Sequence, residues 1–143
     1  MKIETMPKTT FTICVDLDGV LAQPCRGEYE GIKDPVRGAQ KFVARLQGLG
    51  RVLLHSCRTN KKVHHDAEKQ IVEISRWLDR HDFPAGVLIY VGDGKPVARA
   101  YIDDRAVACR PMEKDDGEFF PEFAYDDAVF ETEKLLGLIP ADE

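Results

Sequence analysis

The sequence predicts a doubly wound α/β domain, in which helices cover a parallel sheet on both faces. Two observations predict this fold class. Short apolar runs alternate along the chain with stretches of helical periodicity. The runs are also continuous rather than alternating, as in strands that are buried on both faces. Sheets of this kind bind ligands outside the carboxyl ends of their strands. We therefore expect any functional site to lie where these strands end.

The first strand, loop and helix of this pattern lie within residues 11–50. The apolar, β-branched run FTICVDL, residues 11–17, predicts a buried strand that stops at an Asp-Gly pair. Residues 22–38 are rich in proline and glycine, which predicts a loop. A helix then follows until the glycines at positions 48 and 50 stop it. The apolar residues at helical spacing are Ala39, Phe42, Val43 and Leu46.

The remainder of the chain repeats the pattern. Residues 51–56 predict a second strand, and residues 64–81 predict a helix that a following proline closes. Residues 87–91 predict a third strand and residues 100–102 a short fourth one. A terminal helix is expected near residues 126–136.

Length and composition predict a single domain. With 143 residues, 43% hydrophobic and 31% charged content, the chain is expected to be one soluble globular domain spanning residues 1–143. Its core is expected over about residues 10–110, followed by an acidic helical segment over about residues 113–143. The net charge of -5 excludes the overall basic balance of a typical nucleic-acid-binding domain.

The charges are unevenly distributed along the chain. Residues 33–69 hold nine Lys or Arg against three Asp or Glu, whereas residues 113–143 hold two against eleven. Two interpretations remain open for the basic stretch. It forms an ordinary solvated face, or it adjoins a site for an anionic ligand.

The spacing of the cysteines and the shortness of the apolar runs predict the cellular compartment of the protein. No leader of cationic and then apolar residues opens the chain, and no C-x-x-C pair is present. We therefore expect a reduced, cytoplasmic protein. The longest apolar runs are about five residues, far below the roughly 18 that a membrane span needs, so no membrane partner is expected. The widely spaced cysteines are Cys14, Cys25, Cys57 and Cys109.

Reactive polar groups follow all four predicted strands. Asp16 and Asp18 end the first strand and share one side of it. Ser56 ends the second strand, Lys95 follows the third, and an Asp pair at 103–104 ends the fourth. Clustered carboxylates repel one another unless a cation is present, and hard oxygen ligands suit Mg²⁺, which accepts a substrate phosphate. The sequence therefore predicts a Mg²⁺-dependent phosphate site.

These groups suit phosphoryl transfer. One carboxylate can attack phosphorus as a nucleophile, and a second can protonate the leaving oxygen and later take a proton from water. The metal, the lysine and the hydroxyl would offset the charge of the phosphoryl group.

Four motifs within residues 10–110 resemble those of the haloacid-dehalogenase-like (HAD) phosphohydrolase superfamily. The resemblance implies the HAD Rossmann-like fold, a three-layer α/β/α domain with a central parallel sheet. The gaps between the motifs leave no room for a cap domain, so the chain resembles the small, capless members. The motifs are Asp16-Leu17-Asp18-Gly19-Val20, Leu54-His55-Ser56, Gly94-Lys95-Pro96 and Tyr101-Ile102-Asp103-Asp104-Arg105.

The resemblance also implies a role for each motif residue. Asp16 would be the nucleophile that forms an aspartyl-phosphate, and Asp18 would be the general acid and base. Ser56 would hydrogen-bond the phosphoryl group, and Lys95 would neutralise Asp16 and the phosphate. The carboxyl group at position 18 favours phosphate ester cleavage over carbon–halogen chemistry. The residues that would hold Mg²⁺ are Asp16, Asp18 through its backbone carbonyl, Asp103 and Asp104, with Asp104 favoured over Asp103 as the direct ligand.

The expected function is therefore Mg²⁺-dependent hydrolysis of phosphate monoesters, with a nucleotide or a small phosphorylated metabolite as substrate. Arg58 and Lys61 follow the second strand and are either substrate contacts or solvated residues at a helix entry. Two alternatives stand beside this hypothesis. One is a catalytically silent module that binds Mg²⁺ and phosphate, and the other is a phosphatase of nucleic-acid ends. The oligomeric state is open.

His64 and His65 are adjacent in the predicted helix over residues 64–81. Adjacent residues of a helix do not face the same way. Surface or capping roles are therefore favoured over a metal site for this pair.

Overall fold

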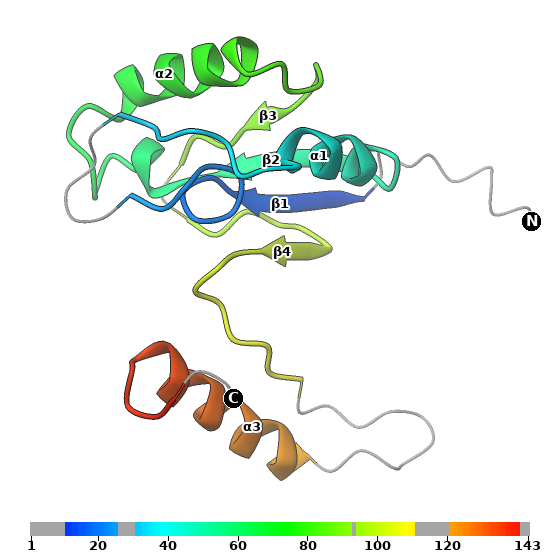
Figure 1. Ribbon diagram of the computed structural model, residues 1–143, viewed down its shortest axis with the longest axis vertical. Coiled ribbons are helices and arrows are strands. Elements are labelled where there is room, and N and C mark those ends of the chain that lie inside the picture. The colour runs from blue at the N-terminus through cyan, green and yellow to red at the C-terminus, as the bar shows by residue number, and fades with distance from the viewer. Residues whose placement is uncertain (1–10, 26–30, 93, 111–120, 141–143) are drawn as a thin grey trace, which may run out of the picture. The chain divides into compact units, whose positions relative to one another are not determined.

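The computed structural model describes residues 11–25, 31–92, 94–110 and 121–140 (Figure 1). The chain divides into two compact units, Met1–Asp104 and Arg105–Glu143, and each is described by itself. In the described part of the chain no helix is long and apolar enough to cross a membrane.

The unit Met1–Asp104 is built on a four-stranded, all-parallel sheet with the order β3-β2-β1-β4. The chain passes from β1 to β2 and β3 in one direction and then returns to the other side of β1 as β4, so β1 and β4 adjoin where the strand order reverses. The sequence prediction of an α/β fold with a parallel sheet is confirmed. The strands are β1 (Thr12–Asp16), β2 (Arg51–His55), β3 (Leu88–Ile89) and β4 (Ala100–Ile102).

Two α-helices and one short helix connect these strands. Helix α1 spans Ala39–Gln47 and stops at Gly48, whose N–H donates to the carbonyls of Ala44 and Arg45. The 3-10 helix η3 spans Cys57–Thr59, and α2 spans Ala67–Arg80. The sequence predicts α2 from residue 64, but the chain runs through turns as far as residue 66.

Strand β3 is shorter than the predicted residues 87–91, and the residue after it is bonded to both β2 and η3. The N–H of Tyr90 still donates to the carbonyl of Leu54 on β2 at 2.8 Å. The carbonyl of Tyr90, however, accepts the hydroxyl of Thr59 at 2.9 Å. The Thr59 side chain of η3 thus takes up this carbonyl and connects the end of β3 to the segment that follows β2.

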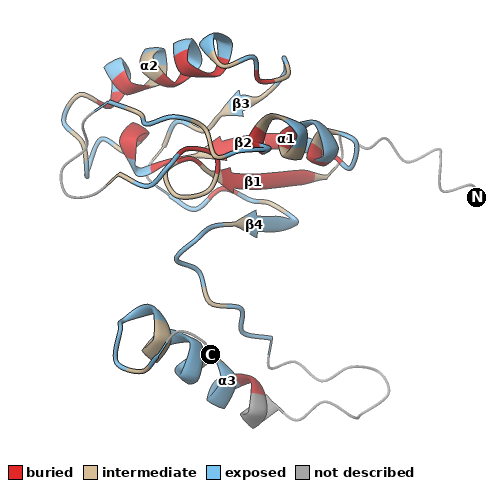
Figure 2. Ribbon diagram, viewed as in Figure 1, coloured by how far each residue is buried: buried red, intermediate tan, exposed pale blue. Residues whose placement is uncertain are grey.

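Helices α1 and α2 pack on one face of the sheet. Along β2, Val52 and Leu54 are buried while Arg51 is exposed and Leu53 is partly exposed. Two successive right-handed crossovers in the same direction place both helices on the same face. The core there is visible as the buried segments of Figure 2. It includes Ile13 and Val15 on β1, Leu17 just after β1, Val52 and Leu54 on β2, Val43 and Leu46 on α1, and Ile74, Trp77 and Leu78 on α2.

The sequence predicted helices on both faces of the sheet, and the structure shows helices on one face in this unit. The connection from β3 to β4, residues 90–99, contains no helix among its described residues. In a doubly wound fold the crossover that reverses direction carries the helix of the second face. The three-layer arrangement implied by the resemblance therefore stays a prediction.

The unit Arg105–Glu143 contains one described helix, α3, at Pro121–Leu135. It begins earlier than the predicted residue 126, since a proline is accommodated in the first turn of a helix, where its missing N–H is not needed. It ends in a turn at Gly137, which has a positive φ of 76°, and the N–H of Leu138 donates to the carbonyl of Glu133 at 2.9 Å. This geometry is a common glycine-based helix end. The rest of the predicted acidic segment, residues 113–120 and 141–143, lies outside the described residues.

Candidate functional site

The register of the sheet brings the predicted site residues to one edge. Asp16, the last residue of β1, pairs with His55 of β2, so Ser56 lies just beyond it. Val15 pairs with Ile102 of β4, so Asp103 and the residue after it leave the sheet beside Asp16. The carboxyl ends of β1, β2 and β4 therefore meet at the point where the strand order reverses, which is the position that α/β sheets use to bind ligands.

Asp16, Asp103 and Asp104 form a carboxylate cluster at this edge. One carboxylate oxygen from each residue lies within 4.8 Å of those of the other two. Asp16 is partly buried, whereas the other two are exposed. The N–H of Leu17 donates to Oδ1 of Asp16 at 2.9 Å. Three hard oxygen donors in this arrangement fit the ligand chemistry of Mg²⁺.

The environment of Asp16 favours its neutral form. Burial and the negative charges of Asp103, Asp104 and Asp18, against the opposing hydrogen bond from Leu17, together raise the pKa of this carboxyl from 3.8 to about 7. A cation placed among these carboxylates would reverse the effect, because it favours the ionised form. The cluster thus concentrates negative charge at this edge of the sheet.

A tight turn after β1 holds the cluster against the backbone. The carbonyl of Leu17 accepts the N–H groups of Val20, Leu21 and Ala22 at 2.9–3.2 Å. Gly19 within this turn has a φ of +89°, and a Cβ there would lie 2.3 Å from Oδ2 of Asp104. Only glycine meets both conditions, so the absence of a side chain at position 19 allows the Asp104 carboxylate to reach the turn.

Asp18 in this turn is held by a buried arginine. Nε and Nη2 of Arg58 donate to Oδ2 and Oδ1 of Asp18 at 2.8 and 2.9 Å. The side chain of Arg58 is 0% exposed and that of Asp18 is 16% exposed. Nη1 of Arg58 also donates to Oε1 of Gln70 on α2 at 3.3 Å. The two-point contact fixes the position and the plane of the Asp18 carboxylate.

Ser56 links the arginine to the sheet edge. It is buried, and its Oγ accepts the backbone N–H of Arg58 at 3.1 Å as the cap of η3. A hydroxyl that accepts one hydrogen bond still has its own proton to donate. Ser56 therefore keeps a donor for a ligand at this edge.

Lys95 does not contact Asp16 in this structure. Its ammonium lies 4.4 Å from the centre of the Tyr101 ring, a cation–π contact. Within the described residues no ion pair joins Lys95 to Asp16. The predicted neutralisation of Asp16 by Lys95 stays a prediction and requires another rotamer of the lysine.

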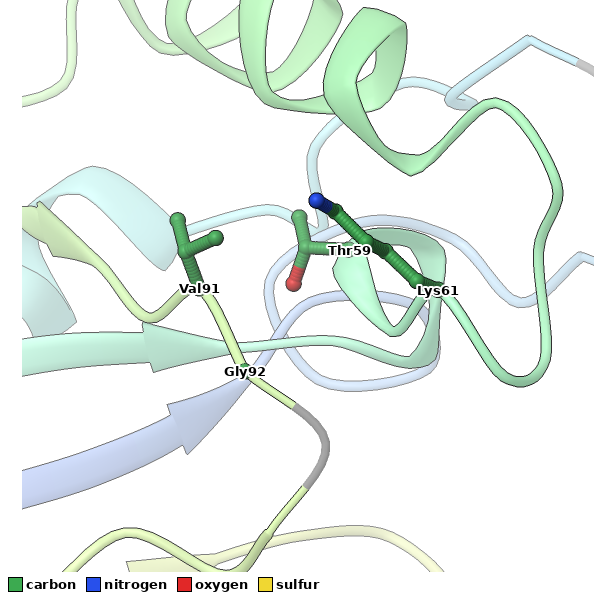
Figure 3. A pocket seen from close by; sticks show the side chains of 4 residues that line it. All are labelled: Thr59, Lys61, Val91 and Gly92. Carbon is green, nitrogen blue, oxygen red and sulfur yellow. The ribbon is translucent and has the colours of Figure 1, made fainter.

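Lys61 lies beside a small pocket near the ends of β2 and β3. Its ammonium is 3.5 Å from Glu68, and both side chains are largely exposed, so this ion pair holds the lysine weakly. The pocket has a volume of about 280 Å³ and is lined by Thr59, Lys61, Val91 and Gly92 (Figure 3). A substrate contact by Lys61 stays a prediction.

Cys14 adjoins the site without offering a nucleophile. Burial and the charges of Asp16 and Asp103, against the opposing charge of Lys95, together raise the pKa of its thiol to about 11. The thiol therefore stays protonated at neutral pH, and a thiolate mechanism at this position is disfavoured.

Sequence reasoning did not identify Arg58 as the partner of Asp18. It left Arg58 as either a substrate contact or a solvated residue at a helix entry, whereas the structure places the guanidinium in the interior against Asp18 and Gln70. A cation two residues after a strand-end serine, at the same edge as Asp18, is the signal that could have suggested the pair. A direct contact of Arg58 with substrate stays a prediction.

Comparisons of the chain with known protein families, with curated proteins and with solved structures find no match.

Proposed function

We propose that the chain is a Mg²⁺-dependent phosphomonoesterase of the HAD type that acts through an aspartyl-phosphate on Asp16. The observation that carries this proposal is the meeting of Asp16, Asp103 and Asp104 within 4.8 Å at the edge where β1 and β4 adjoin. The resemblance of the four motifs supports it. Asp16, Asp103, Asp104 and the backbone carbonyl of Asp18 would hold Mg²⁺, which would offset the charge of the phosphoryl oxygens.

In the first step a carboxylate oxygen of Asp16 attacks phosphorus. The bond between phosphorus and the ester oxygen breaks, and Asp18 gives a proton to the leaving alcohol. In the second step water attacks phosphorus, Asp18 takes the proton of that water, and the bond to Asp16 breaks. Ser56 donates to the phosphoryl group in both steps. Lys95 swings from Tyr101 towards the phosphate when substrate binds.

The contact with Arg58 fixes the orientation of Asp18. Both oxygens of the Asp18 carboxylate accept from the guanidinium, so the group is held in one plane. A proton donor or acceptor must stay within hydrogen-bond reach of the reacting oxygen. Arg58 is thus a positioning residue in this proposal.

The proposal is tested by phosphate release from p-nitrophenyl phosphate and a panel of nucleotides and phosphorylated metabolites. We expect turnover that needs Mg²⁺, disappears in Asp16→Asn and persists in Asp79→Asn, which changes an exposed carboxylate on α2. Tight phosphate binding without turnover would instead indicate the silent binding module. Turnover that is unaffected by Asp16→Asn would overturn the mechanism.

The role of Asp18 as a general acid has its own test. A general acid matters most when the leaving oxygen is a poor leaving group. Asp18→Asn is therefore expected to lower kcat/KM for an alkyl phosphate by about 10² or more, and to lower it less for p-nitrophenyl phosphate. Equal losses with the two substrates would contradict proton donation by Asp18.

A further inference from the structure

A second group of metal-ligating side chains lies away from the carboxylate cluster, in the turn between η3 and α2. His64, His65 and Asp66 each offer one ligand atom, and these atoms all lie within 4.8 Å of one another. The sequence prediction placed the two histidines on a helix, where they would diverge. Helix α2 begins only at Ala67, so the geometric objection to a shared site no longer applies.

The backbone of this turn is held by Asn60. Its carbonyl accepts the N–H of Val63 at 3.0 Å and that of His64 at 2.8 Å, and its side-chain Oδ1 accepts the N–H of Lys62 at 2.9 Å. These bonds fix the direction in which the chain enters residues 64–66. The ligand atoms are thus presented by a hydrogen-bonded turn.

The two imidazoles and the carboxylate lie side by side in this turn. The rings of His64 and His65 are nearly parallel, with an interplanar angle of 18° and their centres 5.9 Å apart. Nδ1 of His64 contacts Oδ1 of Asp66. The side chain of His64 is 13% exposed and that of Asp66 is 34% exposed, whereas His65 is exposed and accessible to solvent.

Asp66 is used differently from an ordinary helix cap. It occupies the N-cap position of α2, but its side chain makes no capping hydrogen bond. An aspartate at this position normally accepts an N–H of the first turn, and that bond stabilises a helix by about 1 kcal/mol. Here the carboxylate turns towards the imidazoles instead.

We propose that His64, His65 and Asp66 bind a divalent cation of the Zn²⁺ class. Two imidazole nitrogens and one carboxylate oxygen form a three-ligand set that leaves a position for water. Imidazole suits Zn²⁺, Co²⁺ or Ni²⁺, whereas the all-carboxylate cluster of Asp16 suits Mg²⁺. The two sites therefore select different metals, and this proposal does not depend on the phosphatase proposal.

The bound cation has a structural consequence for the neighbouring helix. The cation would connect His64 and His65 to Asp66, the residue before α2. Helix α2 carries Gln70, which contacts Arg58. A ligand that binds only the folded state raises the stability of that state. Zn²⁺ is therefore expected to raise the melting temperature of the full chain in the presence of excess Mg²⁺.

The test compares the four histidines of the chain, of which His55 and His81 are the internal controls. Zn²⁺ is added to the full-length protein in excess Mg²⁺, and the imidazole resonances are followed by NMR. We expect the rings of His64 and His65 to shift at one equivalent of Zn²⁺ while those of His55 and His81 stay unchanged. No shift, or an equal shift of all four rings, would overturn the proposal.

Variants test the ligand set by calorimetric titration with Zn²⁺. His65→Ala and Asp66→Asn are each expected to weaken Zn²⁺ binding more than about tenfold. Asparagine at position 66 keeps the capacity to cap the helix, so folding is preserved. Asp79→Asn on α2 is the matched control and is expected to bind as the wild type does. Undiminished binding by both ligand variants would refute the site.

Discussion

The ion pair between Asp18 and Arg58 is the most strongly constrained contact near the candidate site. A guanidinium that is 0% exposed has lost its hydration, and the two-point contact with Asp18 replaces part of it. Sequence reasoning could place Asp18 at the edge because the strand pattern fixes its position. It could not place Arg58, because the rotamer of a long side chain depends on what the neighbouring helix leaves open.

Removing Asp18 is expected to destabilise the fold. Asp18→Ala leaves the buried guanidinium without this carboxylate, so the free energy of unfolding should fall by about 3 kcal/mol. Urea unfolding followed by circular dichroism measures the change. Asp79→Ala, at an exposed position on α2, should stay within about 0.5 kcal/mol of the wild type. Equal stability of the two variants would show that the ion pair contributes little.

The raised pKa of Asp16 predicts a pH-dependent stability in the metal-free protein. Between pH 3.8 and about 7 the folded state holds a proton that the unfolded state releases, so rising pH lowers the free energy of unfolding across this range. Asp16→Asn removes this fall in the free energy of unfolding, because asparagine does not titrate. In EDTA the variant should melt higher than the wild type at pH 8, and the difference should shrink towards pH 4. A difference independent of pH would contradict the raised pKa.

At the scale of elements, the turn after β1 joins the strand to the edge that carries the carboxylate cluster. The sequence predicted a sharp turn from the Asp-Gly pair, and the positive φ of Gly19 confirms it. The close approach of Asp104 to this glycine joins two segments that are far apart in sequence. Local propensity contains no information about such a contact, and for the same reason the sequence did not predict η3 or the early end of β3.

Adding a methyl group in this turn is expected to disturb both segments. Gly19→Ala places a Cβ 2.3 Å from Asp104 at a backbone conformation that L-residues avoid, so the free energy of unfolding should fall by more than about 1 kcal/mol. Gly31→Ala is the matched control, because no atom lies within 4 Å of its added Cβ. Chemical unfolding of both variants makes the comparison. An equal effect of the two substitutions would contradict the packing described.

At the scale of the molecule, the parallel sheet explains how residues from distant parts of the chain form one site. The fold class could be predicted because continuous apolar strands and amphipathic helices leave a clear periodic signal, as in residues 11–17 and in α2. The return of the chain to β4 beside β1 places Asp103 near Asp16. The net charge of -5 gains meaning here, since part of the acidic excess is concentrated where a cation would bind.

The central claim is that Asp16 becomes phosphorylated during turnover. The most direct measurement is to quench the protein with acid while it hydrolyses a substrate labelled in the phosphoryl group, and to locate the label by peptide mass spectrometry. The account predicts label that appears only with Mg²⁺, lies on Asp16 and is absent from Asp16→Asn. Label on another residue, or steady turnover with no labelled protein, would contradict it.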